Sequence, residues 1–196
     1  MPDLRVARSE LVLGGEPPAK IARAEALAAA WLAAAPDHRA VYIATAQTWD
    51  GEMRSLIEPH RPPAGGAARR MATVEEPTEL AHALGLHSRP DTLIVVDCLT
   101  FWLTATLMQA LVPDASEAHA QGRSPIPPIT FPEAVQSCAG PLVLISHHAD
   151  PQRQPARNDL ATLVRTLDTL DQQAVAACER VTLMSGGLPM LIKGLA

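Results

Sequence analysis

The chain has 196 residues, of which 47% are hydrophobic and 19% are charged, and its formal net charge is −5. This length and composition are typical of one globular domain over residues 1–196, and they exclude a disordered or fibrous protein. Only 3% of the residues are aromatic and there is no excess of basic residues, so a nucleic-acid groove with stacking platforms is excluded as well.

Several features indicate a cytoplasmic protein. Charged residues interrupt the first ten positions, where a secretory signal needs a continuous apolar core. Cys98, Cys138 and Cys178 are widely spaced and predict neither a disulfide framework nor a zinc ribbon. The apolar region 93–112 is about long enough to span a bilayer, but Asp97 lies inside it, and a strand followed by a helix explains it better.

Strands alternate with helices along the chain. Short apolar runs predict strands over residues 11–13, 40–45, 91–96, 142–146, 180–184 and 188–192, the last two paired through Ser185-Gly-Gly. Helical signals predict helices over residues 19–34, 50–57, 77–86, 98–111 and 158–177. Residues 61–68 and the proline-rich stretch 113–132 are predicted to be loops, the second an insert in the domain. This alternation predicts an α/β fold with a mainly parallel sheet and flanking helices.

Ligand sites of such sheets gather at the carboxyl ends of the strands. Gly14, Thr45, Asp97 and Ser146 each end or follow one of the first four predicted strands. We expect these four strands to be parallel neighbours, because each is a short apolar run followed by a glycine, polar or acidic end and then a helix. The four residues are then predicted to lie along one edge of the sheet.

The segment from Gly14 to Ile21 resembles the phosphate loop G-x-x-x-x-G-K-[ST], in which backbone N–H groups and a lysine hold phosphates and a hydroxyl binds Mg²⁺. Gly14 and Lys20 stand at the required spacing, whereas Ala19 replaces the second glycine and Ile21 replaces the hydroxyl residue. The two prolines between them have no N–H to donate. Taken alone, the pattern equally fits an ordinary strand–turn–helix in which Lys20 is a surface residue at the helix start.

Seven short motifs, in order, carry a resemblance to a known family. They are Leu13-Gly14-Gly15, Tyr42-Ile-Ala-Thr-Ala-Gln47, Asp50-x-Glu52-Met53, Ile57-x-x-His60-Arg61, Thr73-Val-Glu75-Glu76-Pro77, Val96-Asp-Cys-Leu-Thr100-x-Trp102-Leu103 and Gly187-Leu-Pro189. Over about residues 9–193 the chain resembles the bifunctional adenosylcobinamide kinase/adenosylcobinamide-phosphate guanylyltransferase of coenzyme B12 assembly. The resemblance implies a P-loop nucleotide-binding fold that assembles as a homo-oligomer, often a trimer.

The resemblance also implies an activity. The family phosphorylates the aminopropanol hydroxyl of adenosylcobinamide, with ATP or GTP as the donor, and then transfers GMP from GTP onto that phosphate. A histidine is guanylylated on the way, and the matching position is His60. A neutral imidazole nitrogen is a suitable nucleophile near pH 7. Without the family, a histidine beside Pro59 in a proline- and glycine-rich loop is more often a solvated side chain.

The resemblance further implies a set of nucleotide-binding residues, with Mg²⁺ held by Asp97, directly or through water. The matching positions are Gly14, Gly15, Lys20, Ile21, Ala44, Thr45, Ala46, Arg61, Glu75 and Asp97. Acidic residues at strand ends commonly hold Mg²⁺ across from a phosphate loop. Without the family, Asp97 fits equally well as a cap of the following helix.

The chain departs from the family pattern mainly at this predicted site. The family loop GG-x-x-SGKS is altered after Gly15, an Asn-Glu pair after the fourth strand is replaced by His147-His148, and an Asn-Gln pair late in the long helix becomes Asp171-Gln172. Each lost charge-assisted phosphate contact is worth roughly 1.5–3 kcal/mol. A relative without turnover, which binds corrinoid or a partner subunit, is therefore the alternative to a working enzyme.

Two further functions fit the sequence less well. A generic P-loop ATPase would make the motifs at 42–47 and around His60 coincidental. A metal cluster of His147, His148, Asp150 and His60 is disfavoured, because adjacent histidines point in different directions on most backbones.

Overall fold

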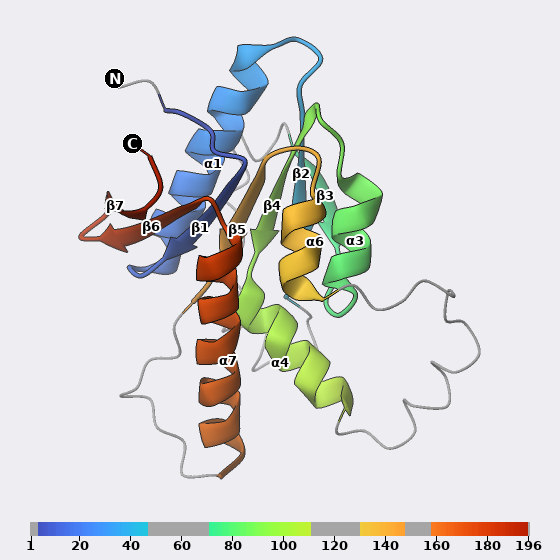
Figure 1. The fold of residues 1–196 in the computed structure, drawn as a ribbon, viewed down its shortest axis with the longest axis vertical. Helices are drawn as coiled ribbons and strands as arrows, with labels where there is room; N and C mark the ends of the chain where they lie inside the picture. The colour runs from blue at the N-terminus through green and yellow to red at the C-terminus, as the bar shows by residue number, and fades with distance from the viewer. Residues whose placement is uncertain (1–3, 47–70, 111–129, 148–157, 196) are drawn as a thin grey trace.

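The computed structural model describes residues 4–46, 71–110, 130–147 and 158–195, to which every structural statement below refers. Figure 1 shows a central sheet with helices on both of its faces. The elements are β1 (Ser9–Leu13), α1 (Pro17–Ala34), β2 (Arg39–Ala44), β3 (Ala72–Glu75), α3 (Leu80–His87), β4 (Thr92–Asp97), α4 (Leu99–Ala110), α6 (Phe131–Ser137), β5 (Leu142–Ile145), α7 (Asn158–Ala177), β6 (Arg180–Ser185) and β7 (Leu188–Lys193).

The sheet has seven strands in the order β3-β2-β4-β5-β1-β6-β7. All neighbours pair in parallel except β6 and β7, which form the predicted antiparallel hairpin. The four strands that we expected to be parallel neighbours lie side by side as β2, β4, β5 and β1, so that prediction is confirmed. The register places Asp97 opposite Ala44 on one side and opposite Ile145 on the other, which brings the carboxyl ends level.

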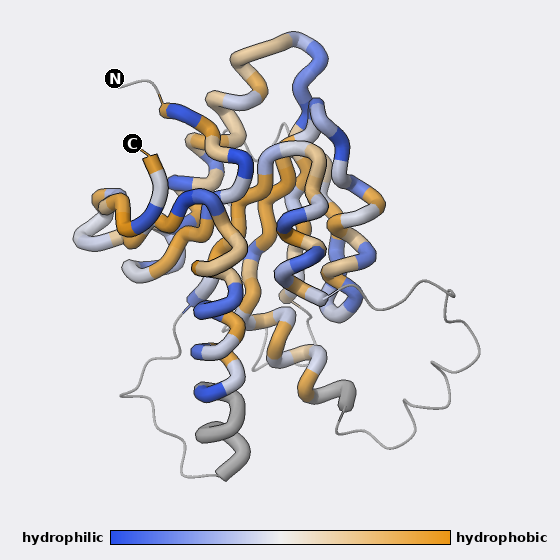
Figure 2. The backbone as a smooth tube through the Cα atoms, in the orientation of Figure 1, coloured by the Kyte–Doolittle hydropathy of each residue, from blue (hydrophilic) through white to orange (hydrophobic). Residues whose placement is uncertain are grey.

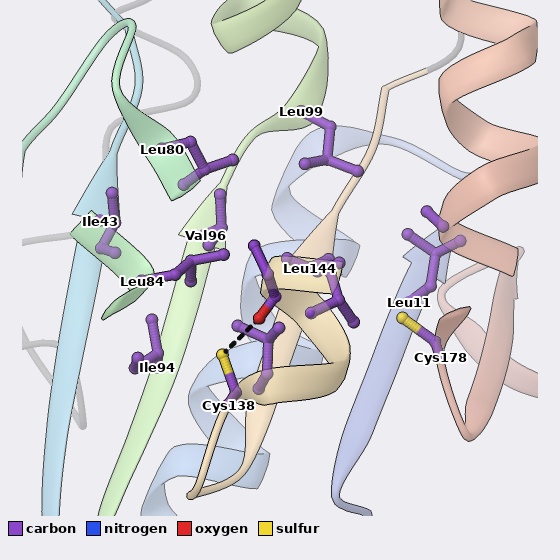
Figure 3. Close-up of a cluster of buried hydrophobic side chains, with 14 of the residues drawn as sticks. Leu11, Ile43, Leu80, Leu84, Ile94, Val96, Leu99, Cys138, Leu144 and Cys178 are labelled. Atoms are coloured by element: carbon purple, nitrogen blue, oxygen red, sulfur yellow. Dashed lines mark hydrogen bonds between the residues drawn. The ribbon is translucent and has the colours of Figure 1, made fainter. Parts of the chain in front are cut away.

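Two apolar cores lie on opposite faces of the sheet, because successive side chains of a strand point to opposite sides. Ile94 and Val96 of β4 face one core together with Leu84 of α3 (Figure 3). Val95 faces the other core together with Leu27 of α1. Figure 2 shows the apolar residues concentrated along the central strands, between the helices of the two faces. The strands are thus buried on both faces, as their nearly continuous apolar runs predict.

Several boundaries differ from the expected ones. Helix α1 begins at Pro17 rather than near residue 19, because proline at the first helical positions lacks only an N–H that has no partner within the helix. Helix α3 begins at Leu80 rather than at residue 77, because the Glu76 carboxylate accepts the main-chain N–H groups of Thr78 and Glu79 in a turn.

Two elements were not predicted. Helix α6 was missed, and the loop 113–132 was predicted too long, because Pro132 lies in the first turn of this helix, where Thr130 and Glu133 form a capping box. Strand β3 was missed because it is a short edge strand with only Val74 packed against a core, so it shows no apolar run. The helix expected over residues 50–57, the loop over 61–68 and the rest of the insert lie outside the described residues.

Strand β4 and helix α4 account for the apolar region 93–110, and α7 has the predicted bounds. Among the helices that the structure describes, none has the length and apolar character needed to cross a bilayer.

A buried ion-pair network ties β1 to α1 and β6. The Glu10 carboxylate, whose residue is 1% exposed, lies 3.0 Å from an Arg23 nitrogen and 3.4 Å from Arg180 Nη1. Arg180 also donates to main-chain carbonyl oxygens of Arg5 and Leu195, near both ends of the described chain. Because the charges satisfy one another, the network can be buried beside the apolar strands.

Candidate functional site at the carboxyl edge of the sheet

The site begins at a tight turn after β1. Gly14 and Gly15 have φ values of +67° and +62°, which side chains of L-residues rarely adopt. A Cβ on Gly14 would lie 2.4 Å from Leu183 Cδ1 and 2.9 Å from the carbonyl oxygen of Met184. Both the backbone conformation and the close approach to β6 therefore require glycine at this position.

Helix α1 occupies most of the segment that resembles a phosphate loop. Pro17 and Pro18 form its first two positions, and the N–H of Ala19 donates to the carbonyl oxygen of Glu16 at 3.1 Å. The side chain of Ile21 is buried in the core on the α1 face. Few N–H donors remain here for a phosphate, and residue 21 supplies no oxygen to a metal ion.

Lys20 is buried next to the glycine turn. Its exposure is 2%, and its Nζ donates to the carbonyl oxygen of Gly15 at 3.3 Å. Burial lowers the pKa of its ammonium, and its electrostatic interactions with the nearby Cys98 and Asp97 oppose that shift. The alternative in which Lys20 is a surface lysine is therefore wrong.

Asp97 lies at the end of β4, on the same face of the sheet as Tyr42. The Tyr42 hydroxyl donates to Asp97 Oδ2, and burial together with this carboxylate raises the pKa of the tyrosine well above its ordinary value. Asp97 Oδ1 lies 3.6 Å from His147 Nε2 and accepts no hydrogen bond within the described residues. Neither oxygen caps α4, so the alternative in which Asp97 caps the following helix is wrong.

Two threonines hold the strand ends together. The hydroxyl of Thr45 donates to the carbonyl oxygen of Cys98 at 2.7 Å and accepts its N–H at 2.8 Å. The hydroxyl of Thr100 makes the same pair of bonds with the main chain of His147, at 2.7 and 3.0 Å. These bonds set the positions of Asp97 and His147 relative to each other.

Ser146 lies at the predicted edge, but on the α7 side of the sheet. Its hydroxyl donates to Asp171 Oδ1 at 2.6 Å, and both residues are buried. The sequence placed Ser146 at the strand ends, but nothing in it indicated the bond to Asp171, which lies 25 positions later in the chain, on α7.

The remaining predicted residues lie beside this cluster or outside the described chain. Ala44 pairs with Glu75 in register, and its carbonyl oxygen accepts the N–H of Glu76 at 2.9 Å. The side chain of Glu75 is exposed, and Ala46 is partly buried. His60 and Arg61, like His148 and Asp150, lie outside the described residues.

Sequence reasoning did not single out Tyr42, Cys98 or Thr100 as site residues. It considered His147 as a departure from the family pattern and in a metal cluster that it disfavoured. One signal was available for the first three, because each lies within a quoted motif at the end of a strand. For His147 the signals were its position immediately after the strand 142–146 and its match to a position of the family pattern at the predicted site.

Comparison with known proteins gives consistent matches. A family model described as "Cobinamide kinase / cobinamide phosphate guanyltransferase" matches residues 10–192. The chain is 35% identical over 189 residues to the bifunctional adenosylcobalamin biosynthesis protein CobP of Pseudomonas aeruginosa, which covers 94% of the chain and 97% of that protein. It is 28% identical over 193 residues to the bifunctional adenosylcobalamin biosynthesis protein CobU of Escherichia coli, covering 93% and 98% respectively.

Proposed function

Because the chain belongs to the cobinamide kinase/cobinamide phosphate guanyltransferase family, we propose that it phosphorylates adenosylcobinamide and then transfers GMP from GTP onto the product. The substrates are adenosylcobinamide, its phosphate, GTP, and ATP or GTP as the phosphoryl donor. The relatives named as bifunctional adenosylcobalamin biosynthesis proteins are matched over nearly their whole length, which supports the presence of both half-reactions in one chain.

One observation carries this proposal, namely the buried ammonium of Lys20 beside the Gly14-Gly15 turn. A buried cation is costly unless anionic groups surround it, and Lys20 faces Asp97 across the strand ends. The phosphates of a nucleotide bound at the turn would supply further negative charge at this point. Ala44, Thr45 and Ala46, at the end of strand β2, would approach the same nucleotide through their main chain. Glu75 and Arg61 are the other residues that we assign to nucleotide binding.

His60 is the proposed nucleophile of the GMP transfer. Its neutral imidazole nitrogen attacks the α-phosphorus of GTP, the bond to the β-phosphate oxygen breaks, and pyrophosphate leaves. An oxygen of adenosylcobinamide phosphate then attacks the same phosphorus, and the imidazole leaves. The first attack requires nitrogen and phosphorus to approach to within roughly 3–3.5 Å in line with the leaving group.

Asp97 is the proposed Mg²⁺ ligand, and the donors around it fit this ion only in part. Its Oδ1 is buried and accepts no hydrogen bond from the described residues, so it can coordinate a cation. The buried side chain of Ile21 offers no oxygen where the family loop has a hydroxyl. Mg²⁺ held here would take most of its remaining ligands from water and phosphate, and would neutralise phosphate charge when bound.

A second candidate function follows from the start of α1. Pro17 and Pro18 remove two N–H donors, and the N–H of Ala19 is bonded to Glu16, so a nucleotide would lose several of its usual contacts. The loss of two such contacts, at roughly 1.5–3 kcal/mol each, weakens binding by orders of magnitude. The second candidate is therefore a relative that binds corrinoid or a partner subunit without turnover.

A titration with GTP and Mg²⁺, followed by labelling, separates the two functions. The enzyme function predicts a saturable nucleotide site and, with α-labelled GTP, an acid-labile and base-stable protein adduct. The adduct is expected to be absent in His60→Ala and present in His82→Ala, which alters an exposed histidine of α3. Label retained by His60→Ala would rule out His60 as the nucleophile. No label in the wild-type protein at millimolar GTP would favour the relative without turnover.

Restoring the loop tests the cause of any weakness. Replacing residues 16–21 with a glycine- and serine-bearing phosphate loop is expected to raise GTP affinity roughly ten- to hundredfold for each regained contact. Micromolar binding by the unmodified protein would refute the idea that the natural loop impairs binding. An unchanged affinity after restoration would place the defect elsewhere in the site.

Homo-oligomerisation, such as a trimer, is part of the proposal, and the edge strand β7 supports it. Its exposed apolar side chains, with Leu195 just beyond it, are those of Leu188, Met190, Leu191 and Ile192. An exposed apolar edge strand offers unpaired main-chain groups and an apolar surface to which another chain can bind. Light scattering should show Leu188→Glu/Ile192→Glu as a smaller species than the wild type, whereas Leu86→Glu, at an exposed leucine of α3, should leave the mass unchanged. A wild-type monomer would contradict oligomerisation.

A single domain over residues 1–196 and a cytoplasmic location complete the proposal. One sheet takes strands from Ser9 to Lys193, which supports one domain. Cys98, Cys138 and Cys178 are buried free thiols, which supports a reducing compartment.

A further inference from the structure

Three side chains of metal-binding type meet where β4 and β5 end. The ligand atoms of the Asp97 carboxylate, the Cys98 thiol and the His147 imidazole all lie within 4.8 Å of one another. Within the described residues they form the one such group. Cys98 is fully buried, and the side chains of Asp97 and His147 are 5% and 12% exposed.

The two oxygens of Asp97 have different surroundings. Oδ2 accepts the hydrogen bond from Tyr42, which orients the carboxylate. Oδ1 is buried, accepts no hydrogen bond from any described residue, and lies 3.6 Å from His147 Nε2. A buried carboxylate oxygen without a hydrogen bond is costly, and a coordinated cation would offset that cost.

The backbone around these donors is already fixed. Thr45 bonds both main-chain groups of Cys98, and Thr100 bonds both main-chain groups of His147. Phe101 packs edge-on against the imidazole, with ring centroids 6.4 Å apart. Metal ligands in proteins are typically held by such outer contacts, which keep the donors in place before the ion arrives.

We propose that Asp97, Cys98 and His147 form a binding site for a divalent transition-metal ion of the Zn²⁺ type. Carboxylate, thiolate and imidazole together suit Zn²⁺, whereas Mg²⁺ prefers oxygen ligands alone. Donors of a tetrahedral zinc site lie roughly 3.3–3.7 Å apart, as follows from its bond lengths, so small side-chain movements would close this group around an ion. Three protein ligands leave a fourth position for water or a ligand oxygen.

Binding replaces the proton of the Cys98 thiol with the metal ion, and the proton passes to solvent. The ammonium of Lys20 lies within electrostatic reach of Asp97 and Cys98 and partly offsets their negative charge. We therefore expect a lower affinity than that of a structural zinc site with four protein ligands. The site shares Asp97 Oδ1 with the proposed Mg²⁺ site, so the two ions would compete for this oxygen. The metal titration is carried out without nucleotide or Mg²⁺, so its outcome does not depend on the proposed function.

The test uses the full chain, stripped with a chelator and titrated with Co²⁺ as a spectroscopic substitute for Zn²⁺. We expect one equivalent to bind and to give a thiolate-to-cobalt charge-transfer band, which Zn²⁺ abolishes. Cys98→Ala should lose the band. Cys138→Ala should retain it, because this matched buried thiol donates to the carbonyl oxygen of Ala134 on the other face of the sheet (Figure 3).

His147→Asn returns the residue type of the family pattern. It should weaken Co²⁺ binding by at least about ten- to hundredfold, because losing even a residue that only supports a metal ligand has an effect of this size. X-ray absorption of the Zn²⁺-loaded wild-type protein should show one sulfur neighbour, and this measurement does not depend on any variant folding. A shell of nitrogen and oxygen alone, a band that survives in Cys98→Ala, unchanged affinity in His147→Asn, or no saturable binding would each overturn the proposal.

Discussion

Replacing Gly14 by alanine should lower the free energy of unfolding by about 2–5 kcal/mol. The left-handed backbone conformation accounts for about 1–2 kcal/mol, because φ is +67° at this position. Overpacking adds about 1–3 kcal/mol. The new Cβ would lie 2.4 Å from the end of the Leu183 side chain, which can move, and 2.9 Å from the Met184 carbonyl oxygen, which belongs to the backbone of β6 and cannot easily do so.

Two other glycines separate these contributions. Gly186, in the β6–β7 hairpin, has a φ of +56° and open space around its Cβ position, so Gly186→Ala should cost only the backbone part, about 1–2 kcal/mol. Gly85 lies within α3 without a positive φ and with open space, so Gly85→Ala should stabilise the protein by about 0.5–1 kcal/mol.

Urea denaturation followed by circular dichroism measures the free energy of unfolding of all three variants. Their midpoints can be compared if the free energy falls with urea concentration at the same slope in each. The difference between Gly14→Ala and Gly186→Ala isolates the close contact with β6. If the two variants lose the same stability, the turn is not packed against β6 as tightly as the structure shows, and the reasoning is refuted. GTP binding by Gly14→Ala, measured under conditions where it stays folded, should also be lost.

Three further predictions concern charged and titratable groups. Glu10→Gln should lower the free energy of unfolding by about 3–5 kcal/mol in denaturation experiments, because it leaves the buried guanidinium of Arg180 without its carboxylate. The control Asp91→Asn, which removes the exposed ion pair with Arg39, should lower it by less than about 1 kcal/mol. Lys20→Met should raise stability at neutral pH and abolish GTP binding in a titration. Because the pKa of Lys20 is lowered in the folded state, the stability of the wild type should rise with pH between that pKa and 10.5, relative to the variant. Equal pH profiles of the two proteins would contradict the burial of this charge. Burial raises the pKa of Cys178 from 9.0 to about 12, so its contribution to the free energy of unfolding is complete below pH 9 and should be lost at about 1.4 kcal/mol per pH unit above it. Cys178→Ala should therefore show a shallower decline of stability at alkaline pH. An unchanged slope would argue against a buried thiol.

The sequence by itself predicted most strands of the sheet and the edge at which the candidate site lies. Strands buried on both faces must be nearly continuous apolar runs, so β4 and β5 were visible without any tertiary information, and so was the hairpin at Gly186-Gly187, where φ is positive. The polar residues that follow such runs lie at the same edge of a parallel sheet, and Thr45 and Asp97 were therefore placed correctly.

Only the tertiary structure decided which of these residues touch. Local patterns predicted that four strands would be neighbours but not their order in the sheet, and the pairing of β4 with β5 is what brings His147 to Asp97, 50 positions earlier in the chain. The same holds for Lys20, which has the sequence environment of a surface helix but is buried because α1 begins at Pro17 and packs its first turns onto the strand ends. Local propensity acts over a few residues, whereas burial, pKa and the geometry of a site depend on side chains that the fold brings together from distant segments.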